Sequence, residues 1–316
     1  MQNRDLLVTG GTVFVSRYVA EYFAARGNRV TVLNRGTRPQ PQHPNISAVV
    51  ADRHALGDAL AGREFDAVLD IAAYTRTDVE ALAAALPSVK DYIFVSSSAV
   101  YPETLPQPFT ETAPCGPNIH WGSYGTNKLE AEQWLTAHLP QSYILRPPYL
   151  YGPMENLYRS PFVFDCAAEE RPFCLPGDGQ MKLQFFHVED LCRFMEILLE
   201  RHPAQRIYNV GNPQAVTETE WVNACYQAAH AQPYYLSVDK AAHEAGRYFP
   251  FRDYEYILDV TAQCELMPST KPLHEGLAEE YRWYSAHPDE VRRKPYLEYI
   301  DREILTAFFG TPEDLE

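Results

Sequence analysis

The sequence lacks the features that mark several special classes of protein. None of its six cysteines belongs to a CxxC pair, which excludes a zinc knuckle and a dithiol redox motif. No apolar run approaches the roughly 20 residues that span a bilayer. The first five residues lead directly into an apolar, strand-like segment, without the longer apolar core of a signal peptide. Since scattered thiols suit a reducing compartment, we expect a cytoplasmic protein without a membrane partner.

Positive charge is also scarce. The 316 residues include 27 lysines and arginines against 42 aspartates and glutamates, which gives a formal net charge of −15. Residues 1–150 carry 12 basic and 14 acidic side chains, whereas residues 151–316 carry 15 and 28. Such an acidic surface repels the phosphates of nucleic acid, so we do not expect a nucleic-acid partner. The uneven distribution instead predicts two functionally distinct parts.

The N-terminal half alternates β-branched runs with amphipathic helical patterns, which is typical of βαβ units. Near-continuous apolar runs indicate parallel strands that are buried on both faces. We expect strands at residues 5–9, 29–34, 46–51, 67–71, 92–96 and 143–146, and helices that end at Gly27 or cover 78–86 and 122–139. The sequence therefore predicts an α/β fold, a Rossmann-type doubly wound parallel sheet with ligands at the carboxyl ends of its strands.

A glycine-rich turn connects the first expected strand to the first expected helix. Gly10 and Gly11 let the backbone pass close to a pyrophosphate, which the exposed N–H groups and the dipole of the helix would stabilise. The usual fingerprint has three glycines, and its last two positions are here Val13 and Ser16. The segment predicts a dinucleotide site, and an ordinary strand–helix turn is the alternative.

The end of the second expected strand bears on the choice of dinucleotide. An acidic residue there would bind the 2′-hydroxyl of the adenosine ribose, but the sequence reads Asn34-Arg35-Gly36. Arg35 could instead meet a 2′-phosphate through a charge-assisted contact. The alternative is that Asn34 accepts the 2′-hydroxyl and Arg35 is solvated. On balance the sequence favours NADP over NAD.

After Gly152 prolines interrupt the pattern and aromatic residues become denser. Residues 184–188, 189–199 and 206–210 still resemble pieces of the sheet domain. We therefore expect a dinucleotide-binding domain over residues 1–153, with returning pieces at about 183–211. A smaller substrate-binding domain is expected over residues 154–182 and 212–316.

Tyr124 and Lys128 are the candidates for the chemistry. Four residues apart on a helix, the phenol and the ammonium project to the same side. A phenol with a pKa near 10 becomes a useful base only if about 4 kcal/mol of stabilisation favours the phenolate, which one nearby positive charge can provide. Ser97 ends a strand upstream, where its hydroxyl can hold a substrate oxygen. The same spacing also occurs in solvated pairs, so the context decides between the two interpretations.

The context is an ordered series of motifs that resembles the extended short-chain dehydrogenase/reductases, in particular the NAD-dependent epimerase/dehydratase group. The series covers about residues 5–285 and reads TGGTxF, DxAAY at 70–74, SSSAVY, YGTNK, RPPYLYGP at 146–153, HVEDL and YNVGN. The resemblance implies that Ser97, Tyr124 and Lys128 are catalytic. It also implies a homodimer.

The same resemblance, together with the residues at the end of the second expected strand, predicts which residues contact the ligands. The pyrophosphate turn, the adenine side and the nicotinamide side together give the cofactor residues Gly10, Gly11, Thr12, Val13, Phe14, Asn34, Arg35, Asp52, Arg53, Ala72, Ala73, Tyr124, Lys128 and Pro147. The substrate residues are expected to be Tyr74, Ser98, Tyr149 and Arg252.

The series also departs from the group at several positions. The 4,6-dehydratases carry an Asp-Glu pair where this chain has Ser98 and Ala99, so dehydration is not expected. Tyr149 and Leu183 replace an asparagine and an arginine that usually accompany a nucleotide sugar. The combination of GGTxF, NRG, RPPYLYGP and FPFRD is most similar to the branch of chloroplast stem-loop-binding proteins and their bacterial relatives, some of which are associated with RNA.

The sequence thus predicts an NAD(P)-dependent epimerase or oxidoreductase that acts on a secondary hydroxyl of a sugar, free or nucleotide-linked, with Tyr124 as general base. An RNA-associated or non-catalytic protein that retains the fold is the alternative. The ten histidines show no HExxH or paired-ligand spacing, so no metal site is expected. We expect His187 to orient the start of a helix instead.

Overall fold

The computed structural model describes residues 3–309, and its first compact unit, unit 1, is built around seven parallel strands. Their order across the sheet is β11-β6-β5-β4-β1-β2-β3. The strands are β1 (Asp5–Thr9), β2 (Arg29–Asn34), β3 (Ile46–Val50), β4 (Ala67–Asp70), β5 (Asp91–Val95), β6 (Tyr143–Arg146) and β11 (Ile207–Asn209). The chain reverses direction across the sheet between β1 and β4, which confirms the expected doubly wound α/β fold.

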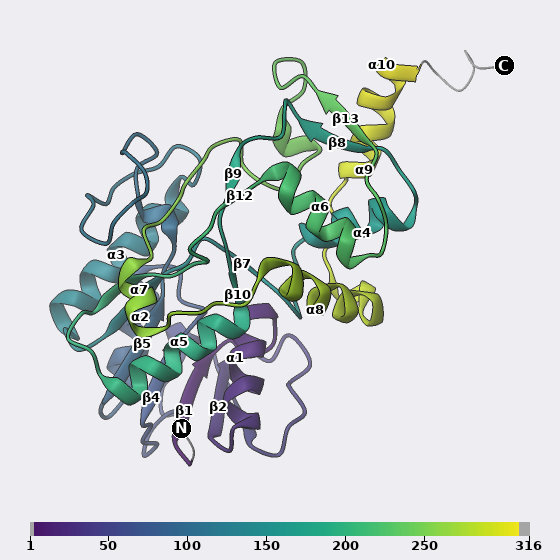
Figure 1. The fold of residues 1–316 in the computed structure, drawn as a ribbon. Helices are drawn as coiled ribbons and strands as arrows, with labels where there is room; N and C mark the ends of the chain where they lie inside the picture. The colour runs from purple at the N-terminus through teal and green to yellow at the C-terminus, as the bar shows by residue number, and fades with distance from the viewer. Residues whose placement is uncertain (1–2, 310–316) are drawn as a thin grey trace. The chain divides into compact units, whose positions relative to one another are not determined.

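Two pairs of helices cover the two faces of this sheet. The helices α1 (Phe14–Ala25) and α5 (Val188–Arg201) pack on each other and share one apolar cluster with the strands, and Figure 1 shows them side by side. The helices α2 (Arg76–Ala85) and α3 (Ser123–His138) share the cluster on the opposite face. Burial on both faces explains why the strands read as continuous apolar runs.

Shorter elements complete unit 1. They are the 3₁₀ turns η1 (Arg53–Ala55) and η2 (Ser98–Val100), the strand pair β7 (Tyr149–Tyr151) and β10 (Phe185–His187), and the helix α7 (Thr261–Leu266). The expected elements are confirmed within a residue or two. The start of α2 moves to Arg76 because Thr75 and Asp78 form a reciprocal capping box there.

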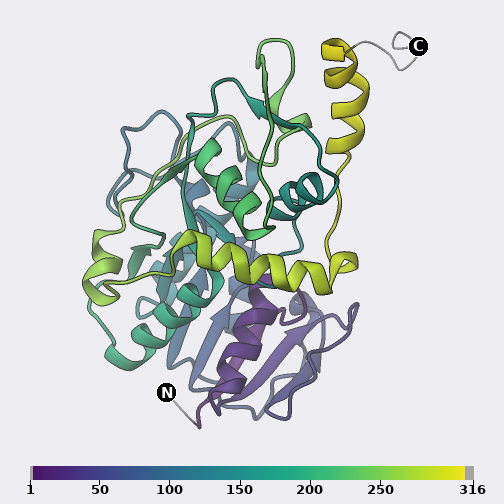
Figure 2. The ribbon, with the colours of Figure 1, turned by 45° about the vertical axis from the view of Figure 1, so that its right-hand side comes forward.

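The second compact unit, unit 2, comprises Asn156–Leu183, Ala215–Glu255 and the chain from Pro272 onward. Its helices α4, α6 and α8 pack on one another, as Figure 2 shows for the long α8. Its elements are α4 (Ser160–Ala168), β8 (Phe173–Pro176), β9 (Lys182–Leu183), β12 (Val216–Thr217), α6 (Glu218–Ala228), β13 (Tyr235–Val238), η3 (Ala245–Arg247), α8 (Leu273–Ala286), η4 (Pro288–Glu290), α9 (Tyr296–Tyr299), the π-helical η5 (Ile300–Leu305) and α10 (Thr306–Phe309).

The division of the chain differs from the expected one in the segment Tyr256–Lys271, which packs with unit 1. Leu258 bridges to Phe109, and the side-chain carbonyl of Gln263 accepts the backbone N–H of Gly211 at 2.7 Å. These buried backbone pairings hold the segment against the sheet. None of the helices in residues 3–309 is long and apolar enough to cross a bilayer.

Candidate active site

The turn after β1 approaches its surroundings too closely for any residue but glycine. Gly10 and Gly11 have φ angles of +88° and +81°. A Cβ on Gly10 would lie 2.7 Å from the Ser16 hydroxyl, and one on Gly11 would lie 2.4 Å from a Val32 methyl. The two glycines are therefore required by the backbone path.

The helix α1 starts directly after this turn and presents its first N–H groups without a side-chain cap. Val13 occupies the N-cap position, and the first turn carries no acidic residue. Phe14 has a φ of +36°, an uncommon conformation for a bulky residue. The Ser16 hydroxyl donates a hydrogen bond to the carbonyl oxygen of Val13 at 3.0 Å. Uncapped donors above a glycine turn suit a pyrophosphate, so these residues fit a dinucleotide.

The side chain of Asn34, at the end of β2, is used within the protein. Its amide donates to the carbonyl of Gly10 at 2.9 Å, and its oxygen accepts the backbone N–H of Gly36 at 2.9 Å. It also exchanges hydrogen bonds with Gln40. Arg35 is exposed and forms no ion pair within the described residues. The arginine, not the asparagine, is therefore available to a ligand at this strand end.

The two residues that were expected on the adenine side have different surroundings. Asp52 is exposed, and its carboxylate caps η1 by accepting the backbone N–H of His54 at 2.9 Å. Arg53 turns inward and donates to the carboxylate of Asp70 at 2.7 Å. One amino group of Arg53 is buried without a hydrogen-bond partner in the described part of the chain.

Ser97 and Tyr124 meet at the carboxyl edge of the sheet. Ser97 follows β5 and caps η2 by accepting the N–H of Ala99 at 3.1 Å, and Tyr124 lies in the first turn of α3. The close approach depends on Gly125, because a Cβ there would lie 2.2 Å from the carbonyl oxygen of Ala99. The glycine after the tyrosine thus lets α3 pack against η2.

Lys128 lies one turn further along α3 and is 2% exposed. Its Nζ donates to the carbonyl oxygens of Ala73 at 2.6 Å and Val95 at 2.7 Å. The ring centroid of Tyr74 lies 5.1 Å from the ammonium. Tyr124 and Lys128 lie four residues apart on α3, as expected, and the ammonium is held by the turn after β4 and by the end of β5.

The half-buried phenol of Tyr124 lies between two other aromatic rings. Ring centroids of Tyr74 and Trp121 lie 6.5 Å and 6.0 Å from it. Burial raises the pKa of Tyr124 above its ordinary value, and the hydrogen bond from Ser97 lowers it in part. In this state the phenol is neutral at physiological pH, so its activation requires further positive charge.

The other expected ligand residues are divided between the units. The carbonyl of Pro147 accepts the N–H of Ser98 at 3.0 Å, which ties η2 to the end of β6. Tyr149 is buried edge-on against Tyr256, with ring centroids 5.1 Å apart. Arg252 is exposed and belongs to unit 2, whereas the other expected site residues all belong to unit 1.

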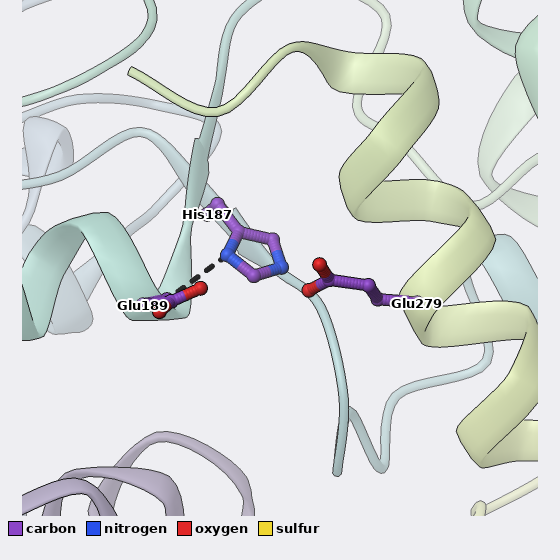
Figure 3. A group of neighbouring side chains, drawn as sticks. All are labelled: His187, Glu189 and Glu279. Atoms are coloured by element: carbon purple, nitrogen blue, oxygen red, sulfur yellow. Dashed lines mark hydrogen bonds between the residues drawn. The ribbon is translucent and has the colours of Figure 1, made fainter. Parts of the chain in front are cut away.

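His187 caps a helix, as expected. Its Nδ1 accepts the backbone N–H of Glu189 at 3.3 Å at the start of α5, and Figure 3 shows this hydrogen bond. Burial, and to a smaller extent Lys271, lowers the pKa of His187 to about 3, so the ring is neutral. Glu279, also drawn in Figure 3, belongs to unit 2.

Sequence reasoning gave no role to three residues that surround the candidate site. Thr9 and Asp70 end β1 and β4 with a 2.6 Å hydrogen bond between their side chains. The ring of Trp121, in the loop before α3, lies tilted beside that of Tyr124. Thr9 and Asp70 could have been found from the sequence, because each is a polar residue at the end of an apolar strand, where ligands bind in such sheets.

Comparison with known proteins bears on the same segment. Residues 6–211 match the NAD dependent epimerase/dehydratase family. Similar proteins include the chloroplast stem-loop binding protein of 41 kDa b of Arabidopsis thaliana, which is 28% identical over 301 residues that cover 88% of this chain and 78% of that protein. The probable GDP-L-fucose synthase 1 of Oryza sativa subsp. japonica is 26% identical over 302 residues, 89% of this chain and 87% of that protein.

Solved structures give the same fold. A UDP-glucose 4-epimerase from Thermotoga maritima, solved with UDP-glucose, superposes with a TM-score of 0.75 at 19% identity and covers 90% of this chain and 99% of its own. A dTDP-glucose 4,6-dehydratase from Bacillus anthracis in complex with NAD gives 0.74 at 19% identity, with 91% and 98% covered. Since the family match spans residues 6–211 of the 316, the chain belongs to the NAD-dependent epimerase/dehydratase family.

Proposed function

We propose that this protein is an NAD(P)-dependent epimerase or oxidoreductase that acts on a secondary hydroxyl of a sugar, with Tyr124 as general base. The observation that carries the proposal is the close packing of η2, which Ser97 caps after β5, against the first turn of α3, which carries Tyr124. The glycine turn of the same unit supplies uncapped backbone donors for a dinucleotide. Nucleotide-linked sugars are the first substrates to test, because the Thermotoga epimerase was solved with UDP-glucose.

The three side chains take separate parts in this proposal. The Ser97 hydroxyl holds the substrate oxygen within reach of the phenol, and the phenolate of Tyr124 accepts the hydroxyl proton. Lys128 contributes a fixed positive charge one helical turn away. The nicotinamide, when bound, supplies hydride acceptance and return. Because burial raises the pKa of Tyr124, the charges of the loaded site have to favour the phenolate.

Ser98 and Ala99 favour a reaction without loss of water. They form η2 next to Ser97, and both are buried, with 3% and 0% of their surface exposed. Neither side chain can supply the acid and base that elimination of water requires. We therefore propose a product that is an epimer or a ketone. Mass spectrometry of the product distinguishes these from a compound lighter by one water.

Arg35 supports the proposal of NADP as the cofactor. It is exposed at the end of β2, whereas the Asn34 side chain is already bonded to Gly10, Gly36 and Gln40. The alternative is NAD, which the Bacillus anthracis dehydratase binds. We expect Arg35→Ala to weaken NADP about tenfold, the loss of a charge-assisted contact, and to leave NAD unchanged. Calorimetric titration with both dinucleotides measures this, and a tighter wild-type affinity for NAD would favour the alternative.

The mechanism is tested with Tyr124→Phe. The holoprotein is incubated with UDP-glucose, UDP-galactose and dTDP-glucose, and turnover is followed by nicotinamide absorbance and product analysis. We expect the variant to lose about 10²–10⁴ in turnover, the contribution of a positioned general base, with nearly unchanged cofactor affinity. Tyr234→Phe, at a tyrosine that is 63% exposed in unit 2, is the matched control. Full activity of Tyr124→Phe overturns the mechanism.

RNA binding is the second candidate, because the Arabidopsis relative is called a stem-loop binding protein. The net charge of −15 opposes it, since affinity for phosphates comes from neutralising basic side chains. We expect no salt-sensitive binding to a stem-loop RNA in filter or fluorescence assays. Micromolar affinity that falls steeply with salt would favour this candidate over the enzyme.

A further inference from the structure

Asp70 is a completely buried carboxylate at the end of β4, next to the candidate active site. It is 0% exposed. One carboxylate oxygen accepts the hydroxyl of Thr9 at 2.6 Å and the guanidinium of Arg53 at 2.7 Å. The other accepts the hydroxyl of Tyr92 at 2.5 Å. Three donors, one of them cationic, stabilise a charge that would otherwise be very costly to bury.

The network continues through Thr9 into the backbone. The Thr9 hydroxyl, while donating to Asp70, accepts the backbone N–H groups of Ile71 at 3.0 Å and Ala72 at 2.9 Å. These hydrogen bonds fix the turn that follows β4. The next residue of the turn is Ala73, whose carbonyl oxygen accepts the ammonium of Lys128 at 2.6 Å. The carboxylate is thereby connected to the lysine through one hydroxyl and one turn.

The contacts of Lys128 itself are neutral. Besides Ala73, its Nζ donates only to the carbonyl of Val95 among the described hydrogen bonds, and the rings of Tyr74 and Phe94 lie 5.1 Å and 4.8 Å away. Carbonyl dipoles and ring faces stabilise a cation but carry no net charge. A buried ammonium in such surroundings depends on charges beyond its first contacts.

Four charged neighbours influence the charge state of this lysine. Burial lowers the pKa of Lys128 to about 8, and the carboxylates of Asp70, Glu132 and Asp78 raise it, Asp70 most of all. The Arg53 guanidinium lowers it. The charged and titratable groups that face Lys128 are thus one carboxylate on β4, one on its own helix, one on α2, and the arginine on η1.

We propose that Asp70 is the positioning residue for Lys128: it fixes the turn that receives the ammonium and supplies the buried counter-charge that keeps the ammonium protonated. Arg53 acts in the opposite sense and moderates this charge. The inference rests on the proposed function only because that function places Lys128 in the active site. Its test is a measurement on the lysine itself.

Two substitutions have opposite expected effects on the titration of Lys128. Asp70→Asn keeps the shape and removes the negative charge, so the midpoint falls by about one pH unit. Arg53→Gln removes the positive charge that opposes the Asp70 carboxylate. The carboxylate then stabilises the Lys128 ammonium more strongly, so the midpoint rises by about half a pH unit. A purely structural role for the network predicts no such reversal of sign.

The midpoints are measured by NMR of the full chain with ¹³C-labelled lysine. The chain contains six lysines, so the Cε signals are few, and Lys128→Met identifies the relevant one. Asp66→Asn is the matched control, because Asp66 pairs with Lys90 at 3.1 Å on the surface of the same unit. We expect it to leave the Lys128 signal unchanged and to move that of Lys90 only.

Two controls separate an effect on folding from an effect of the Asp70 charge. They are the variant Thr9→Val and the thermal melting of each variant. Thr9→Val keeps the Asp70 carboxylate and removes the tie to the turn, so we expect weaker dinucleotide affinity by a few fold. If Asp70→Asn does not fold, the upward shift in Arg53→Gln carries the test. An unchanged Lys128 midpoint in both charge variants overturns the proposal. That outcome is distinct from failure of the proposed function, which is full activity of Tyr124→Phe.

Discussion

The two units stabilise their charged side chains differently. In unit 1, Arg146 and Glu132 are 4% and 3% exposed, and Arg53 and Asp70 are 11% and 0% exposed. In unit 2, the pair of Arg293 with Asp165 has one partner that is 52% exposed. These two pairs of unit 1 therefore lie in a low dielectric, where each charge acts strongly on its neighbours.

The difference follows from how each unit is built. A parallel sheet covered on both faces excludes water from the ends of its central strands, so polar side chains there must bind one another. Unit 2 has two-stranded sheets and an aromatic core, in which the ring of Trp221 packs edge-on to Phe251 with centroids 4.7 Å apart. Its ion pairs, such as that of Lys240 with Asp253, have exposed partners, and such pairs contribute little. The comparison predicts large effects in unit 1 and small ones in unit 2.

The largest effect is expected for Arg146→Met. The guanidinium of Arg146 holds both oxygens of Glu132 at 2.5 to 3.2 Å and also donates to the Tyr101 hydroxyl at 2.8 Å. Without the cation, the Glu132 carboxylate is buried uncompensated, and the free energy of unfolding should fall by about 3–5 kcal/mol. Urea unfolding, with hydrogen exchange to assign the transition to unit 1, measures the loss.

The double variant Arg146→Met with Glu132→Leu is the control for this prediction. It removes both charges, so we expect it to recover part of the stability that the single variant loses. Ordinary surface substitutions change the free energy of unfolding by about 0.5 kcal/mol or less. A change of that size in Arg146→Met would contradict the conclusion that unit 1 shields this ion pair from water.

The same contrast explains what the sequence could predict. Apolar runs such as residues 67–69 identified the strands of unit 1, because burial on both faces leaves continuous apolar segments. Amphipathic spacing and the stop at Gly27 identified its first helix. The end of the fifth strand and the i, i+4 spacing predicted where Ser97, Tyr124 and Lys128 lie in the fold, and their catalytic roles stay a prediction. The inward turn of Arg53 to Asp70 was beyond prediction, because the sequence does not show which of several strand-end groups a long side chain will reach.

Unit 2 left a weaker signal for a related physical reason. Its strands are short, its aromatic residues pack by shape without a helical or strand period, and its boundary depends on single contacts. The segment Tyr256–Lys271 packs with unit 1 through contacts such as that of Gln263 with Gly211. No local sequence pattern predicts a contact of this kind. Tertiary contacts of this kind override local periodicity.

Glu218 departs from this pattern, because its carboxyl group is buried within unit 2, as is that of Glu280. Its side chain, at the start of α6, is 2% exposed. The pKa of Glu218 is raised from 4.5 to about 8, chiefly by burial and also by Asp253 and Asp178, while Lys240 lowers it in part. Between these two pKa values the folded protein keeps a proton that the unfolded chain has released. Stability is therefore lost as the pH rises from about 4.5 through 8.

Glu218→Gln tests this pH dependence. The amide cannot ionise, so we expect the variant to match the wild type at pH 4.5 and to exceed it by about 1–3 kcal/mol at pH 9, a value reduced for partial solvent access. Thermal melting across this pH range measures the difference. Parallel pH profiles of the two proteins would show that Glu218 is ionised in the folded state.

The smallest effect is expected for Lys240→Met, at a surface pair of unit 2. Lys240 and Asp253 lie 2.8 Å apart, but they are 41% and 44% exposed. Water and salt screen such a pair, so its loss should change the free energy of unfolding by about 0–0.5 kcal/mol. The measurement is made at pH 6, where Glu218 keeps its proton and its charge does not respond to the lost cation. A loss above about 2 kcal/mol, typical of a buried pair, would mean that unit 2 excludes water as unit 1 does.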